Sequence, residues 1–240
     1  MIQLEGLNPT EEGLKQGRVT LIRIERGRES NPKIKALIDT AYKKGITVET
    51  VSRGTLDKLS VTGKHQGIIA YAQPYPQWGL SEVLEESGRE VCILILDQVQ
   101  DPHNVGAILR TCDGAGVDGV IIPKKGAADV TATVHRVSMG ASLNIPVWQQ
   151  SIYTAIKTLK DEGLKLIALD ATGQRPYYME DLTGPTAFVI GGEDRGINPT
   201  LLKKCDQVVH IPMMGRLASL NVSVATAVVL YERLRQQENR

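Results

Sequence analysis

Three short segments of the sequence carry polar side chains of the kinds that perform chemistry. Asn104 and Arg110 lie six residues apart in DPHNVGAILRT, Glu193 follows two glycines in VIGGED, and Ser219 and Asn221 flank a leucine in ASLNVS. A guanidinium holds a phosphate or a developing negative oxygen, and a carboxylate accepts a proton. An alternative for Arg110 is that its stem packs on an otherwise apolar helix face while the charged end reaches water. The alternative for the third segment is one helix cap followed by polar surface residues.

Each of these segments lies beyond an apolar stretch that is typical of a buried β-strand. The first follows VCILILD, the second ends TAFVIGG, and the third comes after QVVHIPM. Near-continuous apolar strands are expected where helices cover both faces of a parallel sheet. Ligands bind at the carboxyl ends of such strands, so the three segments should meet at one edge. Further strands are expected at VDGVIIP, IPVW and KLIALD, and helices at NVGAILRTCDGAG (capped by Asn104), DVTATVHRVS, IYTAIKTLKDEG, NPTLLKKC and within 215–236.

A break in the pattern divides the chain into two parts. AQPYPQWG, residues 72–79, contains two prolines, which do not fit inside a helix or a central strand. We therefore expect a domain at 1–73, a linker at 74–80 and a second domain at 81–240. The first part has the pattern of a small α/β sandwich, with strands at VTLIRIE, ITVETVS and QGIIAYA and helices at NPKIKALIDTAYKKG and GTLDKLS. Its junction RGRESNPK either binds phosphate near a helix start or is a solvated loop.

One motif in the second part suggests a dinucleotide-binding enzyme and is rejected. GAGVDG, residues 114–119, matches G-x-G-x-x-G. In a dinucleotide-binding fold this motif must follow a strand and open a helix, so that the helix N-terminus meets the pyrophosphate. Here it follows a predicted helix and leads into a predicted strand, so a glycine in it is expected to end the helix. This order disfavours a Rossmann dehydrogenase.

Composition indicates an ordinary globular protein. The 240 residues carry a net charge of +1, with 42% hydrophobic and 23% charged residues, which argues against a strongly basic nucleic-acid-coating protein. No apolar run reaches the roughly 18–20 residues of a membrane span, and the start does not resemble a signal peptide, so a cytoplasmic location is expected. Three scattered cysteines favour reduced thiols, and the four histidines form no ligand pair with a cysteine, so no metal is expected.

Taken together, the three segments resemble the signature motifs of the SPOUT superfamily, TrmH branch, of RNA ribose 2'-O-methyltransferases. N-x-G-A-I-x-R is matched by residues 104–110, G-x-E-x-x-G by 191–196, and I-P-M followed by S-L-N-V-S by 211–213 and 219–223. The similarity runs from about Val91 to the end, and within the branch it is greatest to the 23S rRNA guanosine 2'-O-methyltransferases. The first part resembles the family's substrate-binding domain, which is similar in fold to ribosomal protein L30e.

This resemblance implies a fold, a methyl donor and partners. The fold class is α/β: a C-terminal SPOUT domain with a parallel sheet and a deep trefoil knot, preceded by a small L30e-like domain. S-adenosylmethionine should lie bent in the knotted loops. The protein should work as a homodimer whose active site is completed across the interface, with 23S rRNA as the expected substrate and no membrane or metal partner. By positional match the donor should contact Gly191, Ile211 and Leu220, with Gly192, Met213 and Leu169 nearby.

The resemblance also implies catalytic roles for Asn104, Arg110, Glu193, Ser219 and Asn221. A ribose hydroxyl must be placed in line with the methyl carbon and lose its proton, so positioning should supply much of the rate. Because a guanidinium stays charged, Arg110 should stabilise the developing oxygen charge or clamp a phosphate rather than act as a base. Glu193 would accept the proton or hold Arg110 in place. Asn104 and Asn221 would orient ribose and phosphate, while Ser219 would present a donor and help satisfy the backbone of the threaded turn.

The sequence is also compatible with two other functions. One is 2'-O-methylation of tRNA or of another rRNA site. The other is a non-catalytic RNA-binding scaffold that keeps the fold, which the presence of all five polar residues disfavours.

Overall fold

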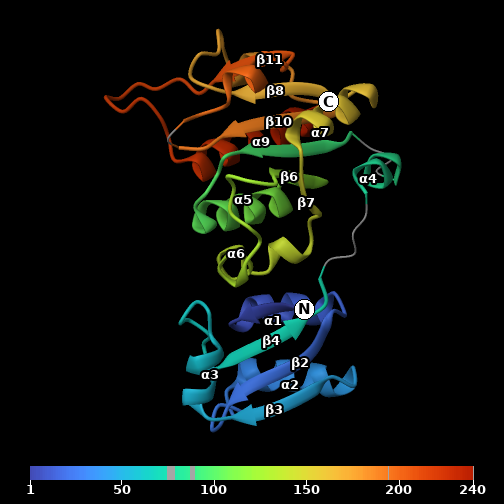
Figure 1. Ribbon diagram of the computed structural model, residues 1–240, viewed down its shortest axis with the longest axis vertical. Coiled ribbons are helices and arrows are strands. Elements are labelled where there is room, and N and C mark those ends of the chain that lie inside the picture. The colour runs from blue at the N-terminus through green and yellow to red at the C-terminus, as the bar shows by residue number, and fades with distance from the viewer. Residues whose placement is uncertain (75–78, 87–89, 194, 240) are drawn as a thin grey trace. The chain divides into compact units, whose positions relative to one another are not determined.

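The computed structural model describes residues 1–74, 79–86, 90–193 and 195–239. These residues form two compact units (Figure 1). One unit contains the first β-sheet with its helices together with residues 129–144, and the other contains the remaining described residues from Gly79 onward. The linker expected at 74–80 includes residues 75–78, which lie outside the described residues, so that boundary stays a prediction.

The N-terminal unit is built on a four-stranded sheet in the order β1-β4-β2-β3. Strand β4 pairs antiparallel with β1 and β2, whereas β2 and β3 are parallel. Helices α1 and α2 bury their aliphatic faces against this sheet, as the alternation of VTLIRIE predicts. The elements are β1 (Ile2–Glu5), α1 (Leu7–Lys15), β2 (Val19–Glu25), α2 (Pro32–Lys43), β3 (Thr47–Val51), α3 (Arg53–Leu59) and β4 (Ile68–Ala72).

The first eighteen residues differ from the sequence-based expectation. They form β1 and α1, whereas the pattern indicated no element before VTLIRIE. Strand β1 has only four residues, and α1 begins after Gly6, a glycine at φ 97 with no capping side chain. Neither element therefore carries a strong local signal, and β1 is defined by its pairing with β4.

The second unit contains a seven-stranded sheet in the order β7-β6-β5-β10-β8-β11-β9, and every pairing in its described residues is parallel. The expected strands are all present, and the two-residue edge strand β9 is an addition. The strands are β5 (Cys92–Asp97), β6 (Gly119–Pro123), β7 (Val147–Gln150), β8 (Lys165–Leu169), β9 (Arg175–Pro176), β10 (Thr186–Gly191) and β11 (Gln207–His210). The predicted α/β class with a parallel sheet in the second part of the chain is confirmed.

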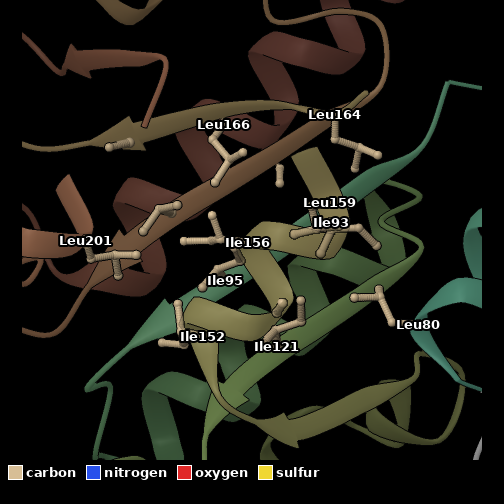
Figure 2. Close-up of a cluster of buried hydrophobic side chains, with 14 of the residues drawn as sticks. Leu80, Ile93, Ile95, Ile121, Ile152, Ile156, Leu159, Leu164, Leu166 and Leu201 are labelled. Atoms are coloured by element: carbon tan, nitrogen blue, oxygen red, sulfur yellow. The ribbon is translucent and has the colours of Figure 1, made fainter. Parts of the chain in front are cut away.

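Helices cover both faces of this sheet. Figure 2 shows Ile152, Ile156 and Leu159 of α7 packed with strand residues such as Ile93 and Ile95 on one face. Because successive strand side chains point to opposite faces, the other buried strand residues face the side where α9 packs against β10 and α5. The helices of this unit are α4 (Leu80–Glu86), α5 (Pro102–Gly114), α7 (Ile152–Asp161), α8 (Pro199–Leu202) and α9 (Val222–Glu238), with the 3-10 turn η2 (Tyr177–Met179). Helix α6 (Ala132–Val137) and the 3-10 turn η1 (Ala141–Leu143) belong to the N-terminal unit.

The glycine motif at 114–119 does not have the structural context of a dinucleotide-binding motif. Helix α5 ends at Gly114, Gly116 adopts a left-handed φ of 68, and β6 begins at Gly119. The motif therefore ends a helix and leads into a strand, as expected. The start of α5 is different from the expectation: Asp101, not Asn104, caps it by accepting a hydrogen bond from the backbone of His103 at 2.9 Å.

Within the described part of the chain, no helix has both the length and the apolar character needed to cross a membrane.

Candidate active site

A cavity of about 380 Å³ opens at the carboxyl ends of three neighbouring strands in the second unit. Its walls come from the loops after β8, β10 and β11 and from the first turn of α9. This edge of a parallel sheet is where ligand sites are expected. Most of the site residues predicted from the sequence line it, namely Leu169, Gly191, Gly192, Glu193, Ile211, Met213, Ser219, Leu220 and Asn221.

Three predicted polar residues are joined by hydrogen bonds at the wall of this cavity. Glu193 Oε1 accepts one bond from Asn104 Nδ2 at 2.9 Å and another from Asn221 Nδ2 at 2.6 Å. Asn221 Nδ2 also lies 3.0 Å from Asn104 Oδ1, which closes the triangle. Two amides thus hold one carboxylate oxygen in place, and no bond to the other oxygen, Oε2, occurs among the described residues. We define Asn104, Glu193 and Asn221 as the amide–carboxylate cluster.

Asn221 has a second task at the start of α9. It is the N-cap residue, and its Oδ1 accepts hydrogen bonds from the backbone and hydroxyl of Ser223 at 2.9 and 2.6 Å. One asparagine therefore both begins the helix with its oxygen and fixes the carboxylate with its nitrogen. Ser219 lines the cavity, and its hydroxyl makes no hydrogen bond within the described residues.

The two glycines before Glu193 are required by space. A side-chain carbon on Gly191 would lie 2.2 Å from the carbonyl carbon of Gly196, and one on Gly192 would lie 2.3 Å from the carbonyl oxygen of Gln98. The Gly192 amide donates to the Asp97 carbonyl at 2.8 Å. The end of β10 is therefore pressed against the end of β5, and this close approach places Glu193 on the cavity wall.

Among the predicted catalytic residues, Arg110 alone neither lines the cavity nor forms a hydrogen bond with a residue that lines it. It is exposed, and it forms no ion pair or hydrogen bond with any described residue. Six residues along a helix correspond to a rotation about 120° away from Asn104, so α5 cannot direct both side chains to one point. Within this chain Glu193 is bonded to the two amides, so the expected contact between Glu193 and Arg110 stays a prediction.

Two carboxylates at the ends of strands were missed by the sequence analysis as functional residues. Asp170 follows β8 directly, lines the cavity, and accepts hydrogen bonds from the backbone and hydroxyl of Thr172. Asp97 ends β5 and accepts a bond from the Asn198 backbone at 2.8 Å, tying β5 to the loop after β10. Their position immediately after apolar strands was the signal that could have identified them.

Comparison with known proteins places these features in a family. The model of the SpoU rRNA methylase family matches residues 91–231, and the model for RNA 2'-O ribose methyltransferase substrate binding matches residues 3–78. The 23S rRNA (guanosine-2'-O-)-methyltransferase RlmB of Pseudomonas syringae pv. tomato is 38% identical over 92% of this chain and 89% of its own length. The chain belongs to the SpoU rRNA methylase family.

Solved structures agree with this assignment. The crystal structure of an RNA 2'-O ribose methyltransferase is 28% identical, with a TM-score of 0.79 over 98% of this chain and 88% of that one. The fold is shared with the SpoU methyltransferase AviRb from Streptomyces viridochromogenes, solved in complex with AdoMet, which is 24% identical with a TM-score of 0.83 over 99% and 91% of the two chains. The expectation of an S-adenosylmethionine-dependent RNA 2'-O-methyltransferase is confirmed at the level of the SpoU family.

The chemistry of the cavity fits this methyl donor. Leucine, isoleucine and methionine side chains give the cavity an apolar surface of the kind on which an adenine ring packs, and Asp170 and Glu193 add acidic groups, which suit a positively charged sulfonium. A volume of about 380 Å³ is in the range of small-molecule sites. Among the described residues, no group of three or more histidine, cysteine, aspartate or glutamate side chains is arranged to hold a metal ion.

Proposed function

We propose that this SpoU family member methylates the ribose 2'-hydroxyl of a guanosine in 23S rRNA. The amide–carboxylate cluster carries the proposal, because it places an oriented carboxylate on the wall of a cavity suited to the methyl donor. The choice of substrate is supported by the relative from Pseudomonas syringae, which is named as a guanosine-specific 23S rRNA methyltransferase. Methylation of tRNA or of another rRNA site is not favoured.

The amide–carboxylate cluster performs the positioning and the proton transfer. When bound, S-adenosylmethionine supplies a methyl carbon on a positively charged sulfur, so a carbon–oxygen bond forms at the ribose as the carbon–sulfur bond breaks. Glu193 accepts the hydroxyl proton at Oε2, because its Oε1 is already occupied by two amide donors. Asn104 and Asn221 keep that carboxylate at one position, which raises the probability of an aligned encounter.

The methyl donor is held by residues from three loops. Leu169, Ile211 and Leu220 would contact the adenine end of the bound donor, with Met213 nearby, and the tight Gly191–Gly192 turn would let backbone approach it. We propose that these loops are knotted, with the C-terminal segment threaded through a loop of the sheet. The convergence of segments after β8, β10 and β11 on one cavity supports this. Experimental coordinates with an unthreaded C-terminal segment would contradict it.

The N-terminal unit brings in the RNA. Its residues match the substrate-binding model of RNA 2'-O ribose methyltransferases, and we propose that it is the L30e-like domain that recruits rRNA. The exposed basic side chains of RGRESNPK, at the start of α2, are available for phosphate contacts. The enzyme would act in the cytoplasm, where ribosomal RNA is assembled.

We further propose a homodimer in which Arg110 acts in the cavity of the partner chain. Arg110 is exposed and rotated away from its own cavity. On the neighbouring helix α9, Val224 is 48% and Tyr231 is 51% exposed, and they lie seven residues apart on one face. Tyr231 also approaches Gly114 of α5. A partner packed on this apolar stripe would receive Arg110 near its own site.

Mapping of 2'-O-methyl groups tests the proposed function. The purified protein is incubated with S-adenosylmethionine and either 23S rRNA or tRNA, and the modified positions are located; total RNA from a strain lacking the gene is mapped in parallel. We expect one guanosine of 23S rRNA to be methylated in the first experiment and unmethylated in the second. Methylation confined to tRNA would assign the other substrate, and no methylation of any RNA would end the proposal.

Mixing two inactive variants tests the role of Arg110. Arg110→Ala should bind S-adenosylmethionine normally but lose methyl transfer, and Ala225→Phe should fill the cavity that Ala225 lines. If Arg110 acts across the dimer, co-refolded mixed dimers contain one complete site and recover about a quarter of wild-type activity, by random association. No recovery despite demonstrated mixed dimers would place Arg110 in its own chain's site, and near-normal activity of Arg110→Ala would remove it from the mechanism.

A further inference from the structure

A second cavity of about 300 Å³ adjoins the first in the same unit. The two cavities share Gly192, Glu193 and Val222 as a common wall. The second is formed at the carboxyl end of β5 by segment 98–101, which leads into α5. Strands β5 and β10 are neighbours, and the chain leaves them toward opposite sides of the sheet, which is the arrangement that opens a crevice for ligands.

The shared wall determines which molecule can occupy the second cavity productively. If the methyl donor occupies the first cavity, the hydroxyl that attacks it must reach the boundary at Glu193 from the other side. The rest of the target nucleotide must then extend into the second cavity. A volume of about 300 Å³ is at the lower end of small-molecule sites, which suits a single nucleoside.

The second cavity offers hydrogen-bonding groups that the protein itself does not use. Gln98 is half-buried, and its carboxamide has no partner within the described residues. Asp101 Oδ1 accepts bonds from His103, whereas its Oδ2 makes no hydrogen bond among the described residues. Gln98 also adopts a φ of 63, a left-handed conformation that is uncommon for a residue other than glycine and that is often retained at functional sites.

We propose that the second cavity binds the base of the target nucleotide and that Asp101 and Gln98 select guanine; this rests on the proposed function. Guanine presents two adjacent donors, at N1 and at its amino group, beside the acceptor O6. An ionised carboxylate only accepts hydrogen bonds, so Asp101 pairs with the two donors, and the Gln98 amide donates to O6. Adenine instead presents an unprotonated N1, which repels the carboxylate. Reading of this base edge requires an unpaired nucleotide, as in sequence-specific recognition of RNA loops.

Arg195 has a different role at the same cavity. It lines the cavity, is exposed, and forms no ion pair with a described residue. A guanidinium there binds the phosphate of the substrate, which is common to all nucleotides. Arg195 therefore contributes affinity without base selection, and this makes it the matched control for Asp101.

The decisive experiment compares two RNA fragments that carry the mapped target as guanosine or as adenosine. The wild type is measured first, and absence of methyl transfer to guanosine would end the proposed function rather than this inference. Asp101→Asn keeps the helix cap, because asparagine and aspartate cap equally well. It replaces one of the two acceptor oxygens of the carboxylate with an NH2 group, which donates hydrogen bonds. We expect its preference for guanosine to fall about tenfold or more, with the Kd for S-adenosylmethionine unchanged. An unchanged preference would overturn the selection of guanine by Asp101.

Two further variants separate selection from general binding. Gln98→Gly removes the carboxamide at a backbone conformation that glycine adopts freely, and it should raise the KM for guanosine RNA and reduce the preference. Arg195→Ala should raise the KM for both RNA fragments by the same factor. If Arg195→Ala changes the preference as much as Asp101→Asn does, the assignment of the two roles is wrong.

A measurement on the wild type keeps the test independent of variant folding. Guanosine 5'-monophosphate and adenosine 5'-monophosphate are compared as inhibitors of methyl transfer at saturating S-adenosylmethionine. We expect the guanosine nucleotide to inhibit at about a tenth of the concentration or less. Equal inhibition by the two nucleotides would contradict a guanine-selecting cavity.

Discussion

At the scale of single residues, the amide–carboxylate cluster shows how few atoms define the site. Asn221 uses its oxygen to begin α9 and its nitrogen to fix Glu193, so the geometry of the helix start and that of the carboxylate are coupled. Asn104 completes the arrangement from α5, a different part of the chain. A substitution that preserves one task of Asn221 and removes the other can therefore separate folding from catalysis.

Asn221→Ser is predicted to separate these tasks. Serine caps a helix about as well as asparagine, but it cannot donate two hydrogen bonds to Glu193 and Asn104. We expect stability close to that of the wild type and a fall of about 100-fold in kcat for methyl transfer, because the carboxylate loses its alignment. Thermal unfolding and single-turnover assays measure the two effects.

The control is the same substitution at Asn31, which caps α2 by accepting bonds from the backbone of Lys33 and Ile34. Asn31→Ser should change neither stability nor kcat appreciably. Full activity of Asn221→Ser would show that Glu193 does not need its amide partners.

Glu5 provides a prediction about stability and pH. Burial by itself raises the pKa of this carboxyl, but hydrogen bonds from Ser60, Thr62, Val61 and Gln3 together lower it below 4.5. A carboxylate whose pKa is lowered in the folded protein stabilises that protein at pH values above its pKa in the unfolded chain. This stabilisation is lost as the pH falls through the pKa of the group in the folded protein. Unfolding by urea should therefore become easier for the wild type below about pH 4.5.

Glu5→Gln should lower the free energy of unfolding at pH 7 by about 1–3 kcal/mol, because the glutamine NH2 group would face groups that themselves donate hydrogen bonds to Glu5. Its stability should also vary less with pH between 4.5 and 3. Glu11→Gln, at an exposed residue paired with Lys15, is the control and should have little effect at pH 7. Parallel pH profiles for wild type and Glu5→Gln would contradict the assigned role of the buried carboxylate.

At the scale of elements, the site depends on how closely the end of β10 approaches the end of β5. The two strands pair in register up to Gly191 and Asp97, and the loops then diverge around the two cavities. Gly192 lies against the Gln98 carbonyl at the shared wall. The side chains of α7 and α8 hold one face of the sheet, while α5 and α9 place the amide–carboxylate cluster from the other.

Gly192→Ala tests this close approach. The added carbon would lie 2.3 Å from the Gln98 oxygen, so the strand ends must separate. We expect a loss of about 1–3 kcal/mol in stability and a clearly weaker Kd for S-adenosylmethionine, because both cavities share this wall. Calorimetric titration and thermal unfolding provide the measurements.

Gly54→Ala is the matched control, since Gly54 lies in helix α3 with room for a side-chain carbon. It should be neutral or slightly stabilising, with unchanged binding of the donor. Binding by Gly192→Ala as tight as by the wild type would show that the wall tolerates movement.

At the scale of the whole molecule, the features that one chain leaves unexplained concern α9 and Arg110. The exposed residues of α9 include a valine and a tyrosine on one face, and Arg110 has no partner among the described residues of its own chain. Association of two chains would bury the exposed valine and tyrosine of α9 and would bring Arg110 to the active site of the partner chain. Oligomeric state and activity should therefore change together.

Tyr231→Glu should therefore yield monomers in sedimentation experiments and a strong loss of methyl transfer, because an unpaired carboxylate would be buried in the apolar interface. Tyr153→Glu is the control: Tyr153 is similarly exposed, on α7, and should leave the dimer intact. A fully active monomer would contradict both the proposed homodimer and the proposed action of Arg110 in the partner chain.

The sequence by itself determined the elements and the loops that matter. Apolar runs such as VCILILD and TAFVIGG specify buried parallel strands through local side-chain character. The GAGVDG motif argues against a Rossmann dehydrogenase for an equally local reason, because it follows a helix and precedes a strand. The polar residues beyond those strands were identified for the same reason. Their motif spacing resembles that of the TrmH branch of the SPOUT superfamily, and the match to the SpoU rRNA methylase family model confirms this resemblance.

Only the tertiary structure decided which of these side chains meet. Glu193 is 89 residues from Asn104 and 28 from Asn221, and no local pattern encodes pairs at such separations. The direction of Arg110 depends on how α5 is rotated, and the second cavity depends on where the ends of β5 and β10 approach each other. Strand β1 is defined by its pairing with β4. Periodicity and caps act within a few residues, whereas these contacts arise from the packing of distant segments, so they become visible only when the chain is folded.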